Sequence, residues 1–267
     1  MTISKTWKVF TDPPSKQPHA RDVMADGWWA TCVPSVQAPG GSVEVGTAAL
    51  PAHLVSALPS LVVTDVDSTL INEEVIDHLA DLAGHRKQVE AITERAMNGE
   101  IDFEASLLQR VALLRGLPAE ALAQVAASIT LTPGAKTLVD WVHRVGGRFG
   151  IVSGGFTQVV APIAQELGID LVRAIDLDIE QGLLTGGVAG PILDAQGKAE
   201  TLKEWAGGQL STTVAVGDGA NDIPMLKTAG LGIAFCAKPA VAKTIGNRLD
   251  LRRLDAVAGL LGHNPAR

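Results

Sequence analysis

The chain has 267 residues, 46% of them hydrophobic, which is enough for a sizeable core and argues against disorder as its dominant state. Its formal net charge of −7 argues against the broad basic surface of nucleic-acid-binding proteins. It has no apolar run typical of a signal peptide or a membrane-spanning helix, and its two cysteines fit neither a zinc site nor a disulfide framework. We expect a cytoplasmic protein that binds neither nucleic acid nor a membrane, and the oligomeric state stays open, a homodimer included.

Residues 1–58 give little indication of their structure. They contain several prolines and show no clear hydrophobic period, so we expect an irregular N-terminal extension of unknown role. The adjacent Trp28 and Trp29 could pack on the main domain or on a partner subunit, but closure of a small subdomain by the two rings is the preferred interpretation.

A short buried strand is predicted at 61–64, where an apolar run ends in Thr64 and Asp65. Four stretches with helical periodicity follow it, separated by glycines and a proline, at 73–83, 86–98, 103–114 and 119–128. They predict a helical cap domain, residues 73–132, inserted after the first strand.

Helices and strands alternate after Pro133. The sequence predicts helices at 135–144, 156–167, 199–205 and 222–228, strands at 148–152, 171–174, 213–216 and 231–235, and a hairpin at 175–193. Short apolar strands between helices indicate an α/β fold with a Rossmann-like parallel sheet core, made of residues 59–72 and 133–267. In such sheets ligands bind beyond the carboxyl ends of the strands, so the residues that follow the strands are the candidates for chemistry.

Three of these strand ends carry reactive groups. Their sequences are DVDST (65–69), SGG (153–155) and GDGAND (217–222). Any one of them could be a plain turn or helix cap, and it is their coincidence that favours a catalytic site. A carboxylate and a phosphate monoester repel each other, by roughly 4 kcal/mol per pair of unit charges about 4 Å apart at an effective dielectric of about 20. A cation has to lie between them, and Mg²⁺ prefers oxygen ligands such as the carboxylates of Asp65 and Asp218.

These motifs, together with Lys198, resemble the four motifs of the haloacid dehalogenase superfamily of aspartate-nucleophile phosphatases. Residues 61–254 also resemble the phosphoserine phosphatase family, in the segments VDSTLINEEVIDHLA, MNGEIDFEASLLQRVALL, VSGGF and VAVGDGANDIPML followed by AFCAKP. The resemblance implies a haloacid dehalogenase-like (HAD-like) core with a helical cap, and Mg²⁺-dependent hydrolysis of phosphoserine as the last step of serine biosynthesis. Residues 1–58 do not resemble the regulatory amino-acid-binding domain of some relatives.

The resemblance implies a role for each core residue. Asp65 is the expected nucleophile, which forms an aspartyl phosphate, and Asp67 the expected proton donor and acceptor, with its backbone carbonyl facing the metal. Ser153 and the amide of Gly154 precede a predicted helix, where unpaired N–H groups favour an anion, so they are assigned to the phosphate. Lys198 would add a positive charge between the nucleophile and the phosphate.

The GDGAND motif supplies the remaining core assignments. Asp218 is the expected metal ligand, and Asp222 is expected to orient a metal-bound water or Lys198 from outside the first coordination shell. Asn221 is assigned to the phosphate or the substrate. A helix cap at 221–222 is an alternative interpretation that is compatible with these roles.

Substrate choice is expected to come from the cap, because the phosphate site cannot distinguish one monoester from another. The resemblance assigns the substrate's ammonium to Glu74 and its carboxylate to Arg110, with Met97 and Phe103 as an apolar wall. Without the resemblance, Glu74 and Arg110 would be ordinary helix charges. Hinges for cap closure are expected near Asn72 and Gly134.

Two alternative functions stay open. One is a phosphatase or phosphotransferase acting on another small monoester such as phosphohomoserine, because one methylene discriminates only weakly. The other is a non-catalytic metabolite sensor that keeps the fold. A pure binder, however, has no need of a second aspartate at position 67.

Overall fold

The computed structural model of the protein describes residues 5–11, 22–25, 27–33 and 43–266. Its strands form an 11-stranded sheet in the order β2-β3-β1-β4-β11-β10-β9-β5-β6-β7-β8. They are β1 (Lys5–Phe10), β2 (Val23–Ala25), β3 (Trp28–Val33), β4 (Glu44–Leu50), β5 (Leu61–Thr64), β6 (Arg148–Phe156), β7 (Leu171–Glu180), β8 (Leu183–Ala189), β9 (Thr213–Gly217), β10 (Leu231–Phe235) and β11 (Arg248–Leu249). The helices are α1 (Ala52–Ser56), α2 (Val75–Leu82), α3 (Arg86–Met97), α4 (Phe103–Ala112), α5 (Glu120–Ser128), α6 (Ala135–Arg144), α7 (Thr157–Leu167), α8 (Ala195–Ala206), α9 (Ile223–Thr228), α10 (Pro239–Thr244) and α11 (Ala256–Leu260), with short turns η1 (Val66–Leu70), η2 (Leu210–Thr212) and η3 (Ala220–Asp222).

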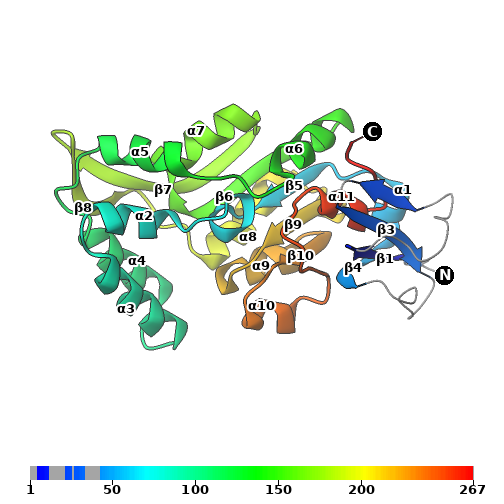
Figure 1. The fold of residues 1–267 in the computed structure, drawn as a ribbon, viewed down its shortest axis with the longest axis horizontal. Coiled ribbons are helices and arrows are strands. Elements are labelled where there is room, and N and C mark those ends of the chain that lie inside the picture. The colour runs from blue at the N-terminus through cyan, green and yellow to red at the C-terminus, as the bar shows by residue number, and fades with distance from the viewer. Residues whose placement is uncertain (1–4, 12–21, 26, 34–42, 267) are drawn as a thin grey trace.

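The strands from β11 to β7 run parallel and form the core of the sheet. Strands β5, β9 and β10 are buried along their whole length, since their apolar side chains face helices on both sides. Figure 1 shows α6 and α7 over one face of the sheet and α8 and α9 over the other. The predicted α/β fold with a Rossmann-like parallel core is therefore confirmed.

Two predicted boundaries near the site differ from the structure. Strand β6 continues through Ser153 to Phe156, beyond the predicted end at residue 152. Helix α8 begins at Ala195, because the side chain of Asp194 accepts from the backbone N–H of Gly197 at 2.7 Å and caps it. Lys198 consequently lies inside the first turns of a helix rather than ahead of one.

The N-terminal segment is not irregular in its described part. Strands β1 to β4 are antiparallel and extend the central sheet, because β4 pairs with β11, with Thr47 opposite Arg248. Trp28 and Trp29 are both buried. Trp28 Nε1 donates to Asp255 Oδ2 at 3.2 Å, next to α11, so this ring packs on the main domain rather than closing a separate subdomain.

Helices α2 to α5, called the cap after the predicted one, lie beside the edge of the sheet formed by β7 and β8 (Figure 1). Helix α4 contacts β8, and α5 contacts α7. The chain enters and leaves the cap through two adjacent segments, where Ile71 and Leu131 form an antiparallel bridge. None of the helices in the described ranges is long and apolar enough to cross a membrane.

Candidate active site

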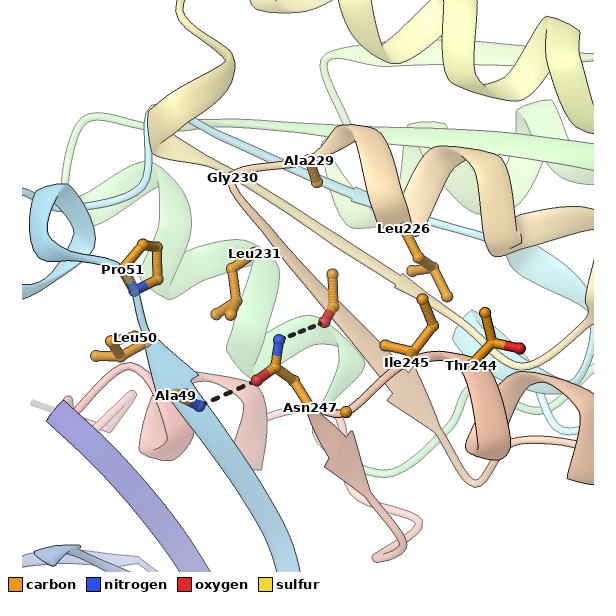
Figure 2. Close-up of a pocket in the computed structure, with 12 residues that line it drawn as sticks. Ala49, Leu50, Pro51, Leu226, Ala229, Gly230, Leu231, Thr244, Ile245 and Asn247 are labelled. Atoms are coloured by element: carbon orange, nitrogen blue, oxygen red, sulfur yellow. Dashed lines mark hydrogen bonds between the residues drawn. The ribbon is translucent and has the colours of Figure 1, made fainter. Parts of the chain in front are cut away.

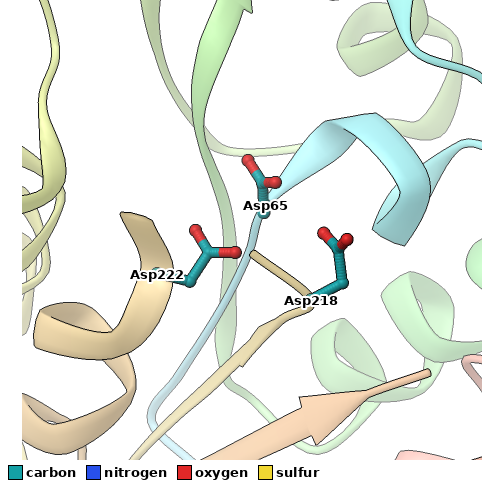
Figure 3. A group of neighbouring side chains, drawn as sticks. All are labelled: Asp65, Asp218 and Asp222. Atoms are coloured by element: carbon teal, nitrogen blue, oxygen red, sulfur yellow. The ribbon is translucent and has the colours of Figure 1, made fainter. Parts of the chain in front are cut away.

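The carboxyl ends of β5 and β9 bring three aspartates together. Asp65 directly follows β5, Asp218 follows β9, and Asp222 ends the turn η3 that comes next. The two strands are adjacent and parallel, so their ends share one edge of the sheet. One oxygen of each carboxylate lies within 4.8 Å of the others, and all three residues are buried. Figure 3 shows the three side chains close together, with Asp65 between Asp222 and Asp218.

Lys198 holds two of these aspartates. Its Nζ donates to Asp65 Oδ1 and to Asp222 Oδ1, at 2.7 Å each. Asp222 Oδ2 accepts from the backbone N–H of Gly219 at 3.0 Å, so both oxygens of Asp222 are engaged. Asp222 is therefore placed to orient Lys198, and Asp65 and Asp218 are the carboxylates better placed to hold a cation.

The cluster combines three buried carboxylates with one buried ammonium. Burial and the neighbouring Asp222 raise the pKa of Asp65, and Lys198 opposes this effect. Burial also raises the pKa of Asp218. Burial alone would lower the pKa of Lys198, but Asp222 and Asp65 raise it, so Lys198 stays cationic. An oxygen donor set with excess negative charge is what a hard divalent cation such as Mg²⁺ prefers, so these residues fit that ion.

Asp67 lies in a kinked turn after Asp65. The next residue, Ser68, has a φ of 54°, in the left-handed region. Asp67 Oδ1 accepts from the backbone N–H of Val75, at the start of α2, at 2.8 Å. Burial and the nearby Glu74 raise the pKa of Asp67 to about 7. A carboxyl group with this pKa is suited to give and take a proton near neutrality.

Ser153 and Gly154 lie at the end of β6 beside Asp67. Ser153 is buried, and its Oγ accepts from the backbone N–H of Gly155 at 2.8 Å. The glycines permit close approach, because a Cβ at Gly155 would lie 2.7 Å from Asp67 Oδ2 and one at Gly154 would lie 3.2 Å from the ring of Phe103. The strand end is therefore contacted by Asp67 from the core and by Phe103 from the cap.

Glu74 and Arg110 come from the cap side of the site. Glu74 precedes α2, and its Oε1 accepts from Ser68 Oγ at 2.9 Å. Arg110 lies in α4, and its Nε donates to the carbonyl oxygen of Ser106 at 3.3 Å. Burial lowers the pKa of Arg110, while the charges of Glu74 and Asp77 oppose this effect. Arg110 and Glu74, both half-buried, thus lie close enough for their opposite charges to interact.

Asn221 and Met97 complete the set of predicted site residues. Asn221 lies in η3, and its Nδ2 would be 3.9 Å from a Cβ at Gly154. Met97 is the last residue of α3, and its side chain lies outside the described part of the structure. The predicted site residues whose side chains are described therefore lie in two places. One group lies at the carboxyl edge of the sheet, and the other lies on the cap that faces this edge.

Two residues of this edge, Thr69 and Lys238, were not predicted from the sequence. Thr69 Oγ1 donates to Asp218 Oδ1 at 3.3 Å. Lys238 Nζ lies 3.4 Å from Asp218 Oδ2 and 3.6 Å from Glu74 Oε1. Lys238 follows the end of β10 in the AFCAKP segment, and the strand-end rule that finds Asp65 and Asp218 also indicates this lysine.

A separate pocket lies at the opposite, amino end of β10 (Figure 2). Its volume is about 330 Å³, and it is lined by Ala49, Leu50, Pro51, Leu226, Ala229, Gly230, Leu231, Gly232, Thr244, Ile245, Gly246 and Asn247. Asn247 fastens β4 to β10, since it accepts from the N–H of Ala49 and donates to the carbonyl of Gly232. None of the lining side chains is ionisable, so acid–base chemistry is not expected here.

Comparison with known proteins agrees with this geometry. The family model of haloacid dehalogenase-like hydrolases matches residues 62–227. The phosphoserine phosphatase of Lactococcus lactis subsp. lactis is 51% identical over 201 residues, which are 74% of this chain and 93% of that protein. Phosphoserine phosphatase SerB2 of Mycobacterium tuberculosis is 52% identical over 205 residues, which are 76% of this chain, and the chain spans about half the length of that relative, 50%.

Solved structures give the same result. A phosphoserine phosphatase described as a phospho-aspartyl intermediate analogue is 42% identical, with a TM-score of 0.70, over 75% of this chain and 97% of that one. A HAD family hydrolase of Salmonella enterica subsp. enterica serovar Typhi is 26% identical, with a TM-score of 0.82, over 97% of this chain and 99% of that one, so the N-terminal strands have counterparts there. The chain therefore belongs to the haloacid dehalogenase-like hydrolase family. Within that family, the phosphoserine phosphatases of Lactococcus lactis subsp. lactis and Mycobacterium tuberculosis are about half identical to it over the matched residues.

Proposed function

We propose that the protein hydrolyses O-phospho-L-serine to L-serine and phosphate through an aspartyl phosphate on Asp65. The observation that carries the proposal is the buried ion-paired cluster of Asp65, Lys198 and Asp222 at the strand ends, below a cap that supplies Glu74 and Arg110. Asp65 and Lys198 would perform phosphoryl transfer. Glu74 and Arg110 match the ammonium and the carboxylate of an amino-acid substrate. The names of the similar proteins support the same substrate.

In the first step, a carboxylate oxygen of Asp65 attacks the phosphorus. The bond from phosphorus to the serine oxygen breaks, and the electron pair moves to that oxygen, which takes a proton from Asp67. The raised pKa of Asp67, about 7, keeps part of the population neutral for this task. Lys198, Ser153 and the amide of Gly154 stabilise the phosphoryl oxygens with fixed donors.

In the second step, Asp67, now a carboxylate, takes a proton from a water molecule. The hydroxide oxygen bonds to phosphorus, the acyl phosphate bond to Asp65 breaks, and the nucleophile returns as a carboxylate. Phosphate then leaves. The contact of Phe103 with Gly154 closes the site from the cap side, which limits the access of other water molecules.

Asp65 and Asp218 would hold Mg²⁺, with Asp67 contributing its backbone carbonyl. When bound, the ion supplies positive charge that offsets the repulsion between the nucleophile and the phosphate. Asp222 would not bind the ion itself. It accepts a 2.7 Å hydrogen bond from Lys198 and so orients that lysine beside the proposed ligands.

The cap recognises the amino-acid part of the substrate. Glu74 accepts from the ammonium, and the planar guanidinium of Arg110 pairs with the carboxylate. Asn221 lies beside Gly154, where it can donate to the phosphate, and Phe103, with Met97, forms the apolar wall. We further propose that residues 73–132 act as this cap on a core of residues 59–72 and 133–267, and that the reaction completes serine biosynthesis in the cytoplasm.

Steady-state kinetics with Mg²⁺ test the substrate assignment. We expect kcat/KM to be highest for phosphoserine, about 10-fold to 200-fold above phosphohomoserine, the range that one methylene gives. Glycerol phosphate and p-nitrophenyl phosphate serve as monoesters without the ammonium and carboxylate. If phosphoserine is hydrolysed no better than these two, the substrate assignment is wrong.

Asp65→Asn tests the mechanism and separates a catalyst from a sensor. The variant is expected to lose phosphate release and to keep phosphoserine binding, measured by calorimetry, because the amide keeps the shape of the side chain but not its nucleophilic charge. Asp140→Asn, an exposed aspartate on α6, is the matched control and should behave like the unaltered protein. Equal phosphate release by the unaltered protein and Asp65→Asn would contradict the aspartyl phosphate.

A further inference from the structure

Arg252 contacts the turn that carries Asp67 from a segment far along the chain. Its Nε donates to Asn72 Oδ1 at 2.9 Å, and its Nη1 donates to the carbonyl oxygen of Ser68 at 3.3 Å. Its Nη2 donates to the carbonyl oxygens of Ile71 and Asn72, at 3.4 Å each. One guanidinium therefore spans both ends of residues 68–72, which its rigid planar set of N–H donors makes possible.

The turn held by Arg252 connects two residues of the proposed site. Ser68 has a left-handed backbone, and its N–H donates to the carbonyl of Glu73 at 3.1 Å. Its hydroxyl donates to Glu74 Oε1, and Asp67 precedes it directly. A displacement of Ser68 would therefore move the proton carrier and the residue assigned to the substrate's ammonium together.

The same turn leads into the joint between core and cap. The N–H of Asn72 donates to the carbonyl of Thr130 at 3.0 Å, and the N–H of Thr132 donates to the carbonyl of Leu70 at 2.9 Å. These bonds pair the two connecting segments with each other. Arg252 ties the first segment of this pair to the C-terminal part of the core, and the N–H of Leu254, two residues on, donates to the carbonyl of Pro133 after the second segment, at 2.8 Å.

We propose that Arg252 is a positioning residue that holds Asp67 and Glu74 in register with Asp65. The inference rests on the proposed function, because it concerns the proton carrier and the ammonium site of that reaction. Arg252 touches neither the substrate nor the nucleophile, and it acts through the carbonyl groups of residues 68–72. Loss of its hydrogen bonds leaves the left-handed turn free to relax.

The test compares Arg252→Gln and Arg252→Lys on two substrates. Arg252→Gln is expected to lower kcat/KM for phosphoserine by about 10-fold to 100-fold, the cost of a misplacement of about 1 Å. For p-nitrophenyl phosphate we expect a loss below about threefold, because its leaving group departs without a proton and carries no ammonium. Arg252→Lys keeps the charge and should recover part of the phosphoserine activity. Arg248→Gln, an exposed arginine of the same segment, is the control and should behave like the unaltered protein.

A purely structural role gives a different result. Equal losses on both substrates, or no loss on either, would overturn the proposal. Hydrogen exchange of residues 66–73, followed by mass spectrometry, gives a readout that does not depend on the substrate. It should be faster in Arg252→Gln than in the unaltered protein and in Arg248→Gln, and equal rates in all three would also overturn the proposal. If the unaltered protein does not prefer phosphoserine, the proposed function fails, while the exchange rates still decide whether Arg252 holds the turn.

Discussion

Lys198 is the residue on which the charge balance of the site depends. It is fully buried, as is Asp222, and its other partner, Asp65, is almost completely buried. Lys198→Met keeps most of the side-chain volume but leaves both carboxylates without their counter-ion. We expect the free energy of unfolding to fall by about 3–5 kcal/mol, and phosphate release to stop. Urea unfolding followed by circular dichroism measures the first effect.

Two variants make the result specific to the ion pairs. Lys203→Met replaces an exposed lysine of the same helix and should change stability by less than about 0.5 kcal/mol. Lys198→Met combined with Asp222→Asn removes one of the unpaired charges and should regain part of the lost stability. A Lys198→Met protein as stable as Lys203→Met would show that the pairs contribute nothing.

Asp67 should give the first step a pH dependence. Burial and Glu74 raise the pKa of this carboxyl to about 7, and the step requires its protonated form. The protonated fraction falls as the pH rises through that value, so the rate of aspartyl phosphate formation from phosphoserine should fall about tenfold per pH unit on the alkaline side. Single-turnover experiments across the neutral range measure this rate. With p-nitrophenyl phosphate the alkaline decrease should vanish, and its persistence would assign the decrease to another group.

At the scale of elements, α11 and the N-terminal strands depend on a close contact. A Cβ at Gly259 would lie 2.3 Å from the Trp28 ring, so α11 can pack here only with glycine at this position. Gly259→Ala is expected to lower the free energy of unfolding by about 1–3 kcal/mol through overpacking. It should leave kcat unchanged, because β11 and β10 separate the described strands β1 to β4 from β9, β5 and β6, whose ends carry the site. Gly246→Ala, where no atom lies within 4 Å of the added Cβ, is the control. Equal stability of the two variants would contradict the close contact.

The elements around the active site are predictable from the sequence, whereas those at the N-terminus are not. Strand 61–64 and helix 135–144 agree with the structure, because one is a short apolar run that ends in Thr64 and the other has a strong hydrophobic period. Strand β4 escapes prediction because small residues such as Gly46 and Ala48 fill its buried positions, so little alternation is visible. The role of Arg252 is not predictable from the sequence, because its partners lie far earlier in the chain, with Asn72 180 residues away.

At the scale of the whole molecule, the cap contacts the core through the packing of α5 on α7 and also through backbone hydrogen bonds at two places. One is the joint where Ile71 bridges Leu131. The other is the β7–β8 hairpin, where the N–H of Leu184 donates to the carbonyl of Leu117 at 2.9 Å and its carbonyl accepts from the N–H of Gly116 at 2.8 Å. A cap that rotates about the joint has to break the second set of bonds unless the hairpin moves with it.

Hydrogen exchange distinguishes these two motions. If the cap leaves the hairpin, the amides of Gly116 and Leu184 lose their partners in the same opening event and should exchange at similar rates under native conditions. Phosphoserine with Mg²⁺, added to the Asp65→Asn variant, favours the closed cap and should slow both amides together. Exchange of individual amides is measured by NMR. If the ligand slows the amide of Asn72 at the joint but leaves Gly116 and Leu184 unchanged, the hairpin moves with the cap. The moving body would then include β7 and β8, and the expected hinges at Asn72 and Gly134 would not describe the opening.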